Sequence, residues 1–136
     1  MVKDAGFWIP RPRFESGRGY DMVIKWKGCI VEESLEDNRI LNEIEIVKVR
    51  ITIEEEREKR WHLYNVLLSE KEIEKIHLLL KKGWYIHFWK DDRIMVLFKD
   101  KKFSLDANDK STWKEAITYG LSIKIPREQL DFLSEF

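Results

Sequence analysis

Three histidines and one cysteine are the side chains of this 136-residue chain that could serve as bases, nucleophiles or transition-metal ligands near neutral pH. His87 lies between Tyr85 and Trp89 in an aromatic segment, residues 83–105. An imidazole in such surroundings can be a hydrogen-bond donor or general base in a ligand pocket. It can equally be a buried residue bonded to a backbone carbonyl or to a tyrosine, because an unbonded polar group there would be costly. Both interpretations stay open, and the candidate ligand-binding residues are His87, Tyr85 and Trp89.

The other candidates for chemistry match no known local motif. His62, His77 and Cys29 could form a metal site only if the sheet order brought them together, since no HxxxH, CxxC or HExxH spacing occurs. A thiolate pair of Cys29 with His62 or His87 is a second option, although a lone Cys in a strand is usually a small core residue. Five acidic residues fall in expected turns, where Asp bonds its own backbone: Asp91, Asp92, Asp100, Asp106 and Asp109. We predict no catalytic residue, metal or cofactor.

Composition limits the class of protein. The chain has 25 basic and 25 acidic residues, so it lacks the positive charge typical of nucleic-acid binders. No stretch is long and apolar enough to cross a membrane, and the N-terminus does not resemble a secretory signal. A single cysteine excludes a disulfide within the chain. Abundant Lys, Glu and Ile fit a thermophile pattern. These features indicate a cytoplasmic protein with no membrane partner.

The first 21 residues differ in pattern from the rest. They contain two of the three prolines, three of the six glycines and three arginines without an apolar stripe. We expect residues 1–21 to be an N-terminal arm, or an extension that precedes a natural start at Met22. Residues 22–136 then form one domain, because their number suits a single hydrophobic core.

Strand and helix patterns follow one another from Met22. Alternation predicts a strand within residues 22–33 and a second strand over residues 44–54, with Val47, Val49, Ile51 and Ile53 on one face. A third strand, residues 61–68, is apolar on both faces and therefore expected in the middle of the sheet. Ser69 and Glu72 form a capping box that predicts a helix ending at Gly83.

The aromatic segment reads as a three-stranded meander. Turns at residues 91–92 and 100–101 would pair Trp89 with Ile94, and Phe98 with Phe103. One face then carries Tyr85, His87, Trp89, Ile94, Val96, Phe98, Phe103 and Leu105. After the meander, Thr112 and Glu115 form a capping box that predicts a helix, and Gly120 is expected to end that helix. Pro126 predicts the start of a last short helix. We predict an α+β fold: a mostly antiparallel sheet of five to six strands with two or three helices on one face.

The other face of the meander carries Trp84, Phe88 and Met95, and an apolar face must be covered. We expect these residues to form the interface of a homodimer, which makes the protein a non-enzymatic interaction module that self-associates. The alternatives are a small-ligand-binding protein or enzyme with a pocket around His87, and a single-stranded nucleic-acid binder that stacks bases on Trp84 and Phe88.

Two segments also resemble a family of small uncharacterised archaeal and bacterial proteins. The pattern consists of Gly-Trp-Tyr at residue 83, Ser-Thr-Trp at 111, Tyr-Gly at 119 and Ile-Pro-Arg-Glu-Gln-Leu-Asp at 125, and residues 27–41 are similar too. The resemblance covers most of residues 22–132. It implies one compact prokaryotic domain and no particular activity, cofactor or catalytic residue.

Overall fold

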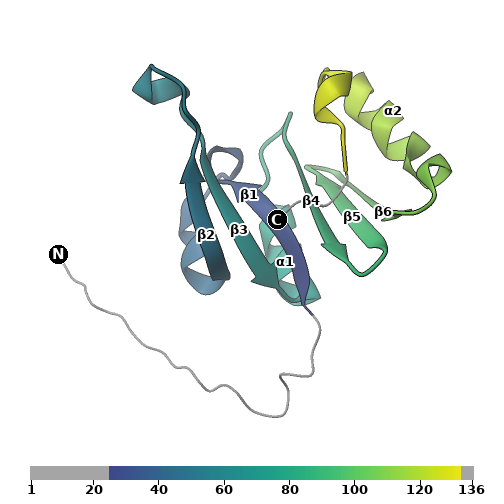
Figure 1. Cartoon of the computed structure of the whole chain (residues 1–136), viewed down its shortest axis with the longest axis horizontal. Helices are drawn as coiled ribbons and strands as arrows, with labels where there is room; N and C mark the ends of the chain where they lie inside the picture. The colour runs from purple at the N-terminus through teal and green to yellow at the C-terminus, as the bar shows by residue number, and fades with distance from the viewer. Residues whose placement is uncertain (1–24, 133–136) are drawn as a thin grey trace, which may run out of the picture.

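A computed structural model describes residues 25–132, so the expected N-terminal arm and the start of the first strand at Met22 lie outside the described residues. Six strands form one sheet in the order β2-β3-β1-β4-β5-β6, and every neighbouring pair is antiparallel (Figure 1). The strands are β1 Trp26–Val31, β2 Glu45–Ile51, β3 His62–Leu68, β4 Tyr85–Lys90, β5 Arg93–Phe98 and β6 Lys101–Asp106. The α-helices are α1 Glu70–Leu78 and α2 Lys114–Ser122, and the predicted α+β class with an antiparallel sheet is confirmed.

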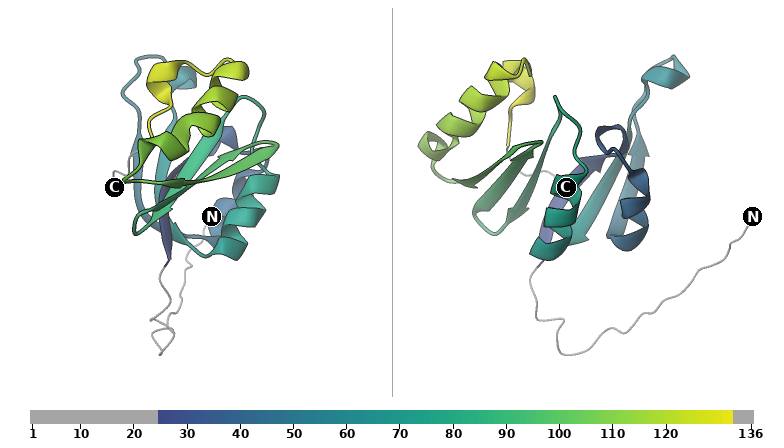
Figure 2. Two further views of the ribbon diagram at one scale, coloured as in Figure 1. Left: turned by 90° about the vertical axis from the view of Figure 1, so that its right-hand side faces the viewer. Right: turned by 180° about the vertical axis from the view of Figure 1, so that it is seen from behind.

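The two helices cover opposite faces of the sheet, which corrects the expectation of helices on one face. Ile73 and Ile76 of α1 pack in one core with Phe88 and Leu97. On the other face, α2 contributes to a second core with Val96. Seen from behind, α1 lies in front of the strands, whereas α2 stands at the far end of the sheet (Figure 2). The cause is the meander itself, whose strands are apolar on both faces and need a cover on each.

The meander is confirmed, with one change of register. Trp89 pairs with Ile94 and His87 with Val96, as expected. Between β5 and β6 the turn is formed by residues 99–100, so Phe98 pairs with Lys101 and not with Phe103. This register differs by two residues from the expected one. Because side chains alternate with a period of two, the predicted shared face is preserved.

The start of α1 is as predicted, but its end is not. The Glu72 amide donates to Ser69 Oγ at 3.2 Å and the Ser69 amide donates to Glu72 Oε1 at 2.9 Å, which completes the capping box. The helix ends at Leu78, five residues before Gly83. Gly83 has a φ of 88° and serves the turn that leads into β4, a conformation that glycine adopts without strain.

The expected limits of the second helix are wrong at both ends. The Thr112 hydroxyl donates to the Asp109 carbonyl at 2.7 Å, and a short 3₁₀ helix, Lys110–Trp113, precedes α2, which begins without a side-chain cap. Gly120 lies inside α2 and does not end it. A side chain at Gly120 would come within 2.7 Å of Leu130, so this glycine allows the chain after α2 to pack closely against the helix.

Candidate functional site

Tyr85, His87 and Trp89 lie on the same face of β4, as their alternation predicts. The rings of Tyr85 and His87 are stacked with centroids 6.2 Å apart, and those of His87 and Trp89 are 5.9 Å apart. Phe132, near the end of the described chain, meets His87 edge-on at 6.0 Å. The imidazole is therefore partly buried in an aromatic cluster.

A cleft of about 390 Å³ opens beside His87. It lies between β1, β4, the residue just before β3 and the segment after α2. The lining residues are Cys29, Val31, Trp61, Gly83, Trp84, Tyr85, Ile86, His87, Ile125 and Gln129. Two of the three residues predicted to bind a ligand, His87 and Tyr85, line this cleft, and Trp89 does not. Sequence reasoning missed Trp61 as a lining residue and did not place Cys29 in a pocket, because β1 and β4 become neighbours only through the sheet order.

The three candidates for a metal site, His62, His77 and Cys29, are not brought together, whereas Cys29 and His87 line the same cleft. His77 Nε2 lies 2.7 Å from the Phe98 carbonyl oxygen, and His62 bonds to Glu33. Burial raises the pKa of the Cys29 thiol, although the Arg50 guanidinium acts in the opposite direction. At neutral pH the sulfur is therefore protonated, which disfavours nucleophilic chemistry. Within residues 25–132 no group of three or more His, Cys, Asp or Glu side chains is arranged to hold a metal ion.

One residue of the expected dimer interface, Phe88, lies inside the protein's own core. Phe88 is fully buried, and Trp84 and Met95 pack against the same core. Phe88 is therefore not accessible to a second copy, because α1 covers this face of the sheet, whereas Trp84 and Met95 are only partly buried. The same burial removes Phe88 from the surface on which a single-stranded nucleic acid would stack.

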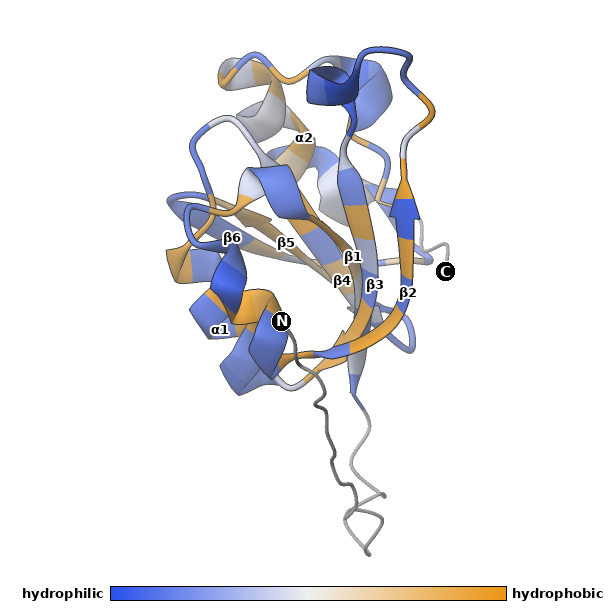
Figure 3. Ribbon diagram, turned by 90° about the vertical axis from the view of Figure 1, so that its left-hand side faces the viewer, coloured by the Kyte–Doolittle hydropathy of each residue, from blue (hydrophilic) through white to orange (hydrophobic). Residues whose placement is uncertain are grey.

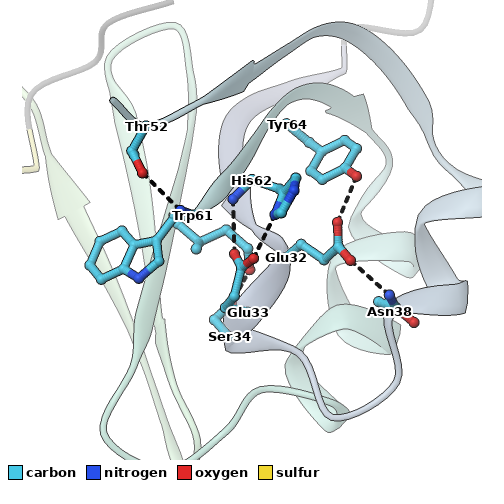
Figure 4. Close-up of polar contacts among 9 residues, drawn as sticks. Glu32, Glu33, Ser34, Asn38, Thr52, Trp61, His62 and Tyr64 are labelled. Atoms are coloured by element: carbon cyan, nitrogen blue, oxygen red, sulfur yellow. Dashed lines mark hydrogen bonds and ion pairs between the residues drawn. The ribbon is translucent and has the colours of Figure 1, made fainter. Parts of the chain in front are cut away.

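A polar cluster between β1 and β3 was not foreseen (Figure 4). Glu33 accepts hydrogen bonds from the His62 amide at 2.9 Å and pairs with His62 Nδ1 at 2.6 Å. The Tyr64 hydroxyl donates to Glu32 at 2.7 Å, and Asn38 donates to the same carboxylate at 2.8 Å. The bond to Glu32 raises the pKa of Tyr64 to about 12. The only signal in the sequence is the Glu-Glu pair after β1, whose partners are about thirty residues away in the chain.

Most of the exposed large apolar side chains lie on the edge strand β2 or just beyond it. Every residue of β2 is exposed, including Val47, Val49 and Ile51, which were predicted to share one face. Val49 is 50% exposed and Ile53, just beyond the strand, is 97% exposed. Figure 3 shows hydrophobic residues along this outermost strand. Among the described residues, the large hydrophobic side chains that are exposed lie between 46 and 61, except for Leu78 and Leu121.

Comparisons with known proteins add no relative. No family model, no curated protein and no solved structure matches the chain. The resemblance to an uncharacterised prokaryotic family therefore stays a prediction. Neither helix of the described chain has the length and apolar character that a membrane crossing requires.

Proposed function

We propose that the protein is a non-enzymatic interaction module that forms a homodimer by antiparallel pairing of two copies of β2. The observation that carries this proposal is the exposed apolar alternation of Val49, Ile51 and Ile53 on an edge strand. In the described structure β2 pairs with β3 alone, so the backbone groups on its other side point outward. An edge strand with exposed apolar side chains is a template for pairing with another chain.

The partner that pairs with β2 is a second copy of the chain, because the sequence of this edge strand is complementary to itself. A two-fold axis through Ile51 sets Ile51 opposite its own symmetry mate and Val49 opposite Ile53 of the second copy. Residues directly opposite in an antiparallel pair share a face, so apolar side chains meet apolar ones. On the other face the same register sets Lys48 opposite Glu54 of the second copy, a pair of opposite charges.

The local structure limits the pairing to this segment. The register with β3 shifts between Ile46 and Lys48, which marks a bulge and ends the regular strand on that side. On the other side the Thr52 amide donates to the Trp61 carbonyl at 3.0 Å, so the extended chain continues past the end of β2. Residues 48–52 are therefore held as one extended strand, and the proposed dimer continues this pairing through Ile53 and Glu54.

The expected affinity is modest. Val49 and Ile51 are about half exposed and Ile53 is almost fully exposed, so dimerisation buries roughly two side chains per copy. Burying four such side chains in the dimer contributes on the order of 6–12 kcal/mol, and association costs about 4–15 kcal/mol. Because these two terms are similar, a dimer with a micromolar or weaker dissociation constant is expected.

Sedimentation velocity of the full chain from about 1 μM to about 1 mM tests this proposal over the range that a modest affinity requires. We expect a concentration-dependent dimer, and Ile51→Glu should abolish it because two carboxylates would meet at the axis. Leu78→Glu, on the exposed side of α1, is the matched control and should dimerise normally. A strict monomer, or a dimer that Ile51→Glu leaves intact, would contradict the proposal.

Exchanging the charges of Lys48 and Glu54 tests the register of the proposed pairing between two copies of β2. Lys48→Glu should weaken the dimer because it faces Glu54 of the second copy with a like charge. The double variant Lys48→Glu with Glu54→Lys should restore it. If the double variant is no tighter than Lys48→Glu alone, the axis does not pass through Ile51.

A further inference from the structure

We propose that the cleft beside His87 binds an uncharged, planar aromatic molecule of one or two fused rings. The first observation is the chemistry of its wall. Of all residues in the chain 37% are charged, yet the ten residues that line the cleft include no Asp, Glu, Lys or Arg. None of the lining residues offers a charged ligand an ion pair in exchange for its lost hydration, so the wall favours a neutral ligand.

Two polar groups in the wall, the Cys29 thiol and the Tyr85 hydroxyl, are uncharged at neutral pH. Burial raises the pKa of the Cys29 thiol, and burial together with the Asp131 carboxylate raises the pKa of Tyr85 to about 12. The Tyr85 hydroxyl is already used, since it donates to the Gln129 carbonyl. The Cys29 thiol and the His87 imidazole also line the cleft, so they place polar atoms beside the polar edge of a bound ligand.

Aromatic rings form two walls of the cleft. Trp61 and Trp84 meet edge to face with centroids 5.1 Å apart and planes at 61°. Tyr85 and His87 are stacked with planes at 22°. A planar aromatic ligand can contact each of these rings with its face or its edge. Stacked and edge-to-face contacts are the favoured geometries for aromatic pairs. A non-planar apolar guest of the same size cannot do so.

The size and rigidity of the cleft further limit which ligands it can bind. A volume of about 390 Å³ lies at the small end of ligand pockets, which suits one or two fused rings. The Trp61 backbone is held on both sides, because its amide donates to Thr52 Oγ1 at 2.8 Å and its carbonyl accepts from the Thr52 amide. The wall is thus largely formed before a guest arrives, which reduces the entropic cost of binding.

The test is a titration of the full chain, followed by ¹H–¹⁵N NMR, with three probes. Indole is planar and neutral, indole-3-carboxylate has the same rings with a charge, and cyclohexanol is neutral but not planar. We expect saturable shifts at the amides of Cys29, Trp61 and His87 with indole, with a dissociation constant of about 1 mM or lower. The carboxylate should bind at least about tenfold more weakly, and cyclohexanol should not saturate. No saturable shift with indole, or equal binding of the other two probes, would overturn the proposal.

Substitutions in the cleft test whether indole binds there. Trp61→Ala should weaken indole binding by about tenfold, while Trp61→Phe should stay within about threefold of the unmodified chain because it keeps an aromatic face. Leu121→Ala is the matched control, since Leu121 is 40% exposed, Trp61 is 41% exposed, and Leu121 does not line the cleft. Unchanged indole binding by a folded Trp61→Ala variant would also overturn the proposal. Ile51→Glu should leave indole binding intact, so the cleft and the dimer can fail separately.

Discussion

Glu33 binds His62 twice, once through the backbone amide at 2.9 Å and once through ring Nδ1 at 2.6 Å. The contact joins the turn after β1 to the first residue of β3. Burial acts to raise the pKa of Glu33, but the hydrogen bonds from the His62 amide and ring outweigh it and lower that pKa below 4.5. The bond to Glu33 is also the main reason that the pKa of His62 lies above 6.5.

The stabilising effect of this pair should be limited to a window of pH. The pKa of His62 is raised on folding, so its contribution is fully present below the unfolded value of 6.5 and is lost as pH rises through the folded value. The pKa of Glu33 is lowered, so its contribution is present above 4.5 and is lost as pH falls through the folded value. The pair therefore stabilises the fold most between the unfolded pKa values of 4.5 and 6.5, and its contribution falls off on either side of that window.

An NMR titration of the His62 ring checks this window. In Glu33→Gln the His62 pKa should fall back toward 6.5, because the charged partner is gone. Glu36→Gln is the matched control, since the Glu36 carboxylate lies nearby in sequence but pairs with Lys99 at 3.2 Å. An unchanged His62 pKa in Glu33→Gln would show that the contact does not set the titration.

Gly28 marks a place where β1 must approach β4 without a side chain. A Cβ at this position would lie 2.3 Å from Phe88 Cδ1 and 2.9 Å from the His87 carbonyl oxygen. Phe88 is fully buried and cannot move aside, so Gly28→Ala should lower the free energy of unfolding by about 1–3 kcal/mol or more. Urea denaturation measures this loss.

A double-mutant cycle tests the cause. Phe88→Leu frees the space that the new methyl group needs, so Gly28→Ala should cost less in that background than alone. If the two losses simply add, the contact with Phe88 is not the reason for glycine at this position.

Local patterns predicted the second half of the fold better than the first. The two-residue turn at Asp91 and Asp92 determines the pairing of Trp89 with Ile94, because a tight hairpin leaves no freedom of register. The capping box at Ser69 is likewise local. The turn after Phe98 was misplaced by one residue, since Lys99, Asp100 and Lys101 are similarly suited to a turn.

Relations between distant segments could not be predicted from periodicity. The alternation of Val49 and Ile51 is the same for a strand with a covered face and for an exposed edge strand, and only the sheet order separates these cases. In the same way, nothing local to Phe88 shows that α1 would cover it. The cleft depends on Cys29 and His87 becoming neighbours across β1 and β4, which is again a property of topology.

The capping box at the start of α1 should contribute measurably to stability. Ser69→Ala removes the acceptor for the Glu72 amide and should lower the free energy of unfolding by about 1 kcal/mol. Ser122→Ala is the matched control at the end of α2, where the hydroxyl only donates to the Tyr119 carbonyl, and its effect should be within about 0.5 kcal/mol. Equal losses in the two variants would contradict a specific role of the N-terminal cap.

Phe132 should be one of the most sensitive positions in the described chain. Its ring is fully buried and meets Tyr85 at 5.5 Å and Trp113 at 5.6 Å, so it joins the end of the chain to β4 and to the start of α2. Phe132→Ala leaves a large cavity in this core and should cost about 3–5 kcal/mol in urea denaturation. Leu78→Ala removes an apolar side chain that is 82% exposed and should cost no more than about 0.5 kcal/mol. A loss below about 1 kcal/mol for Phe132→Ala would mean that α2 and β4 hold together without this ring.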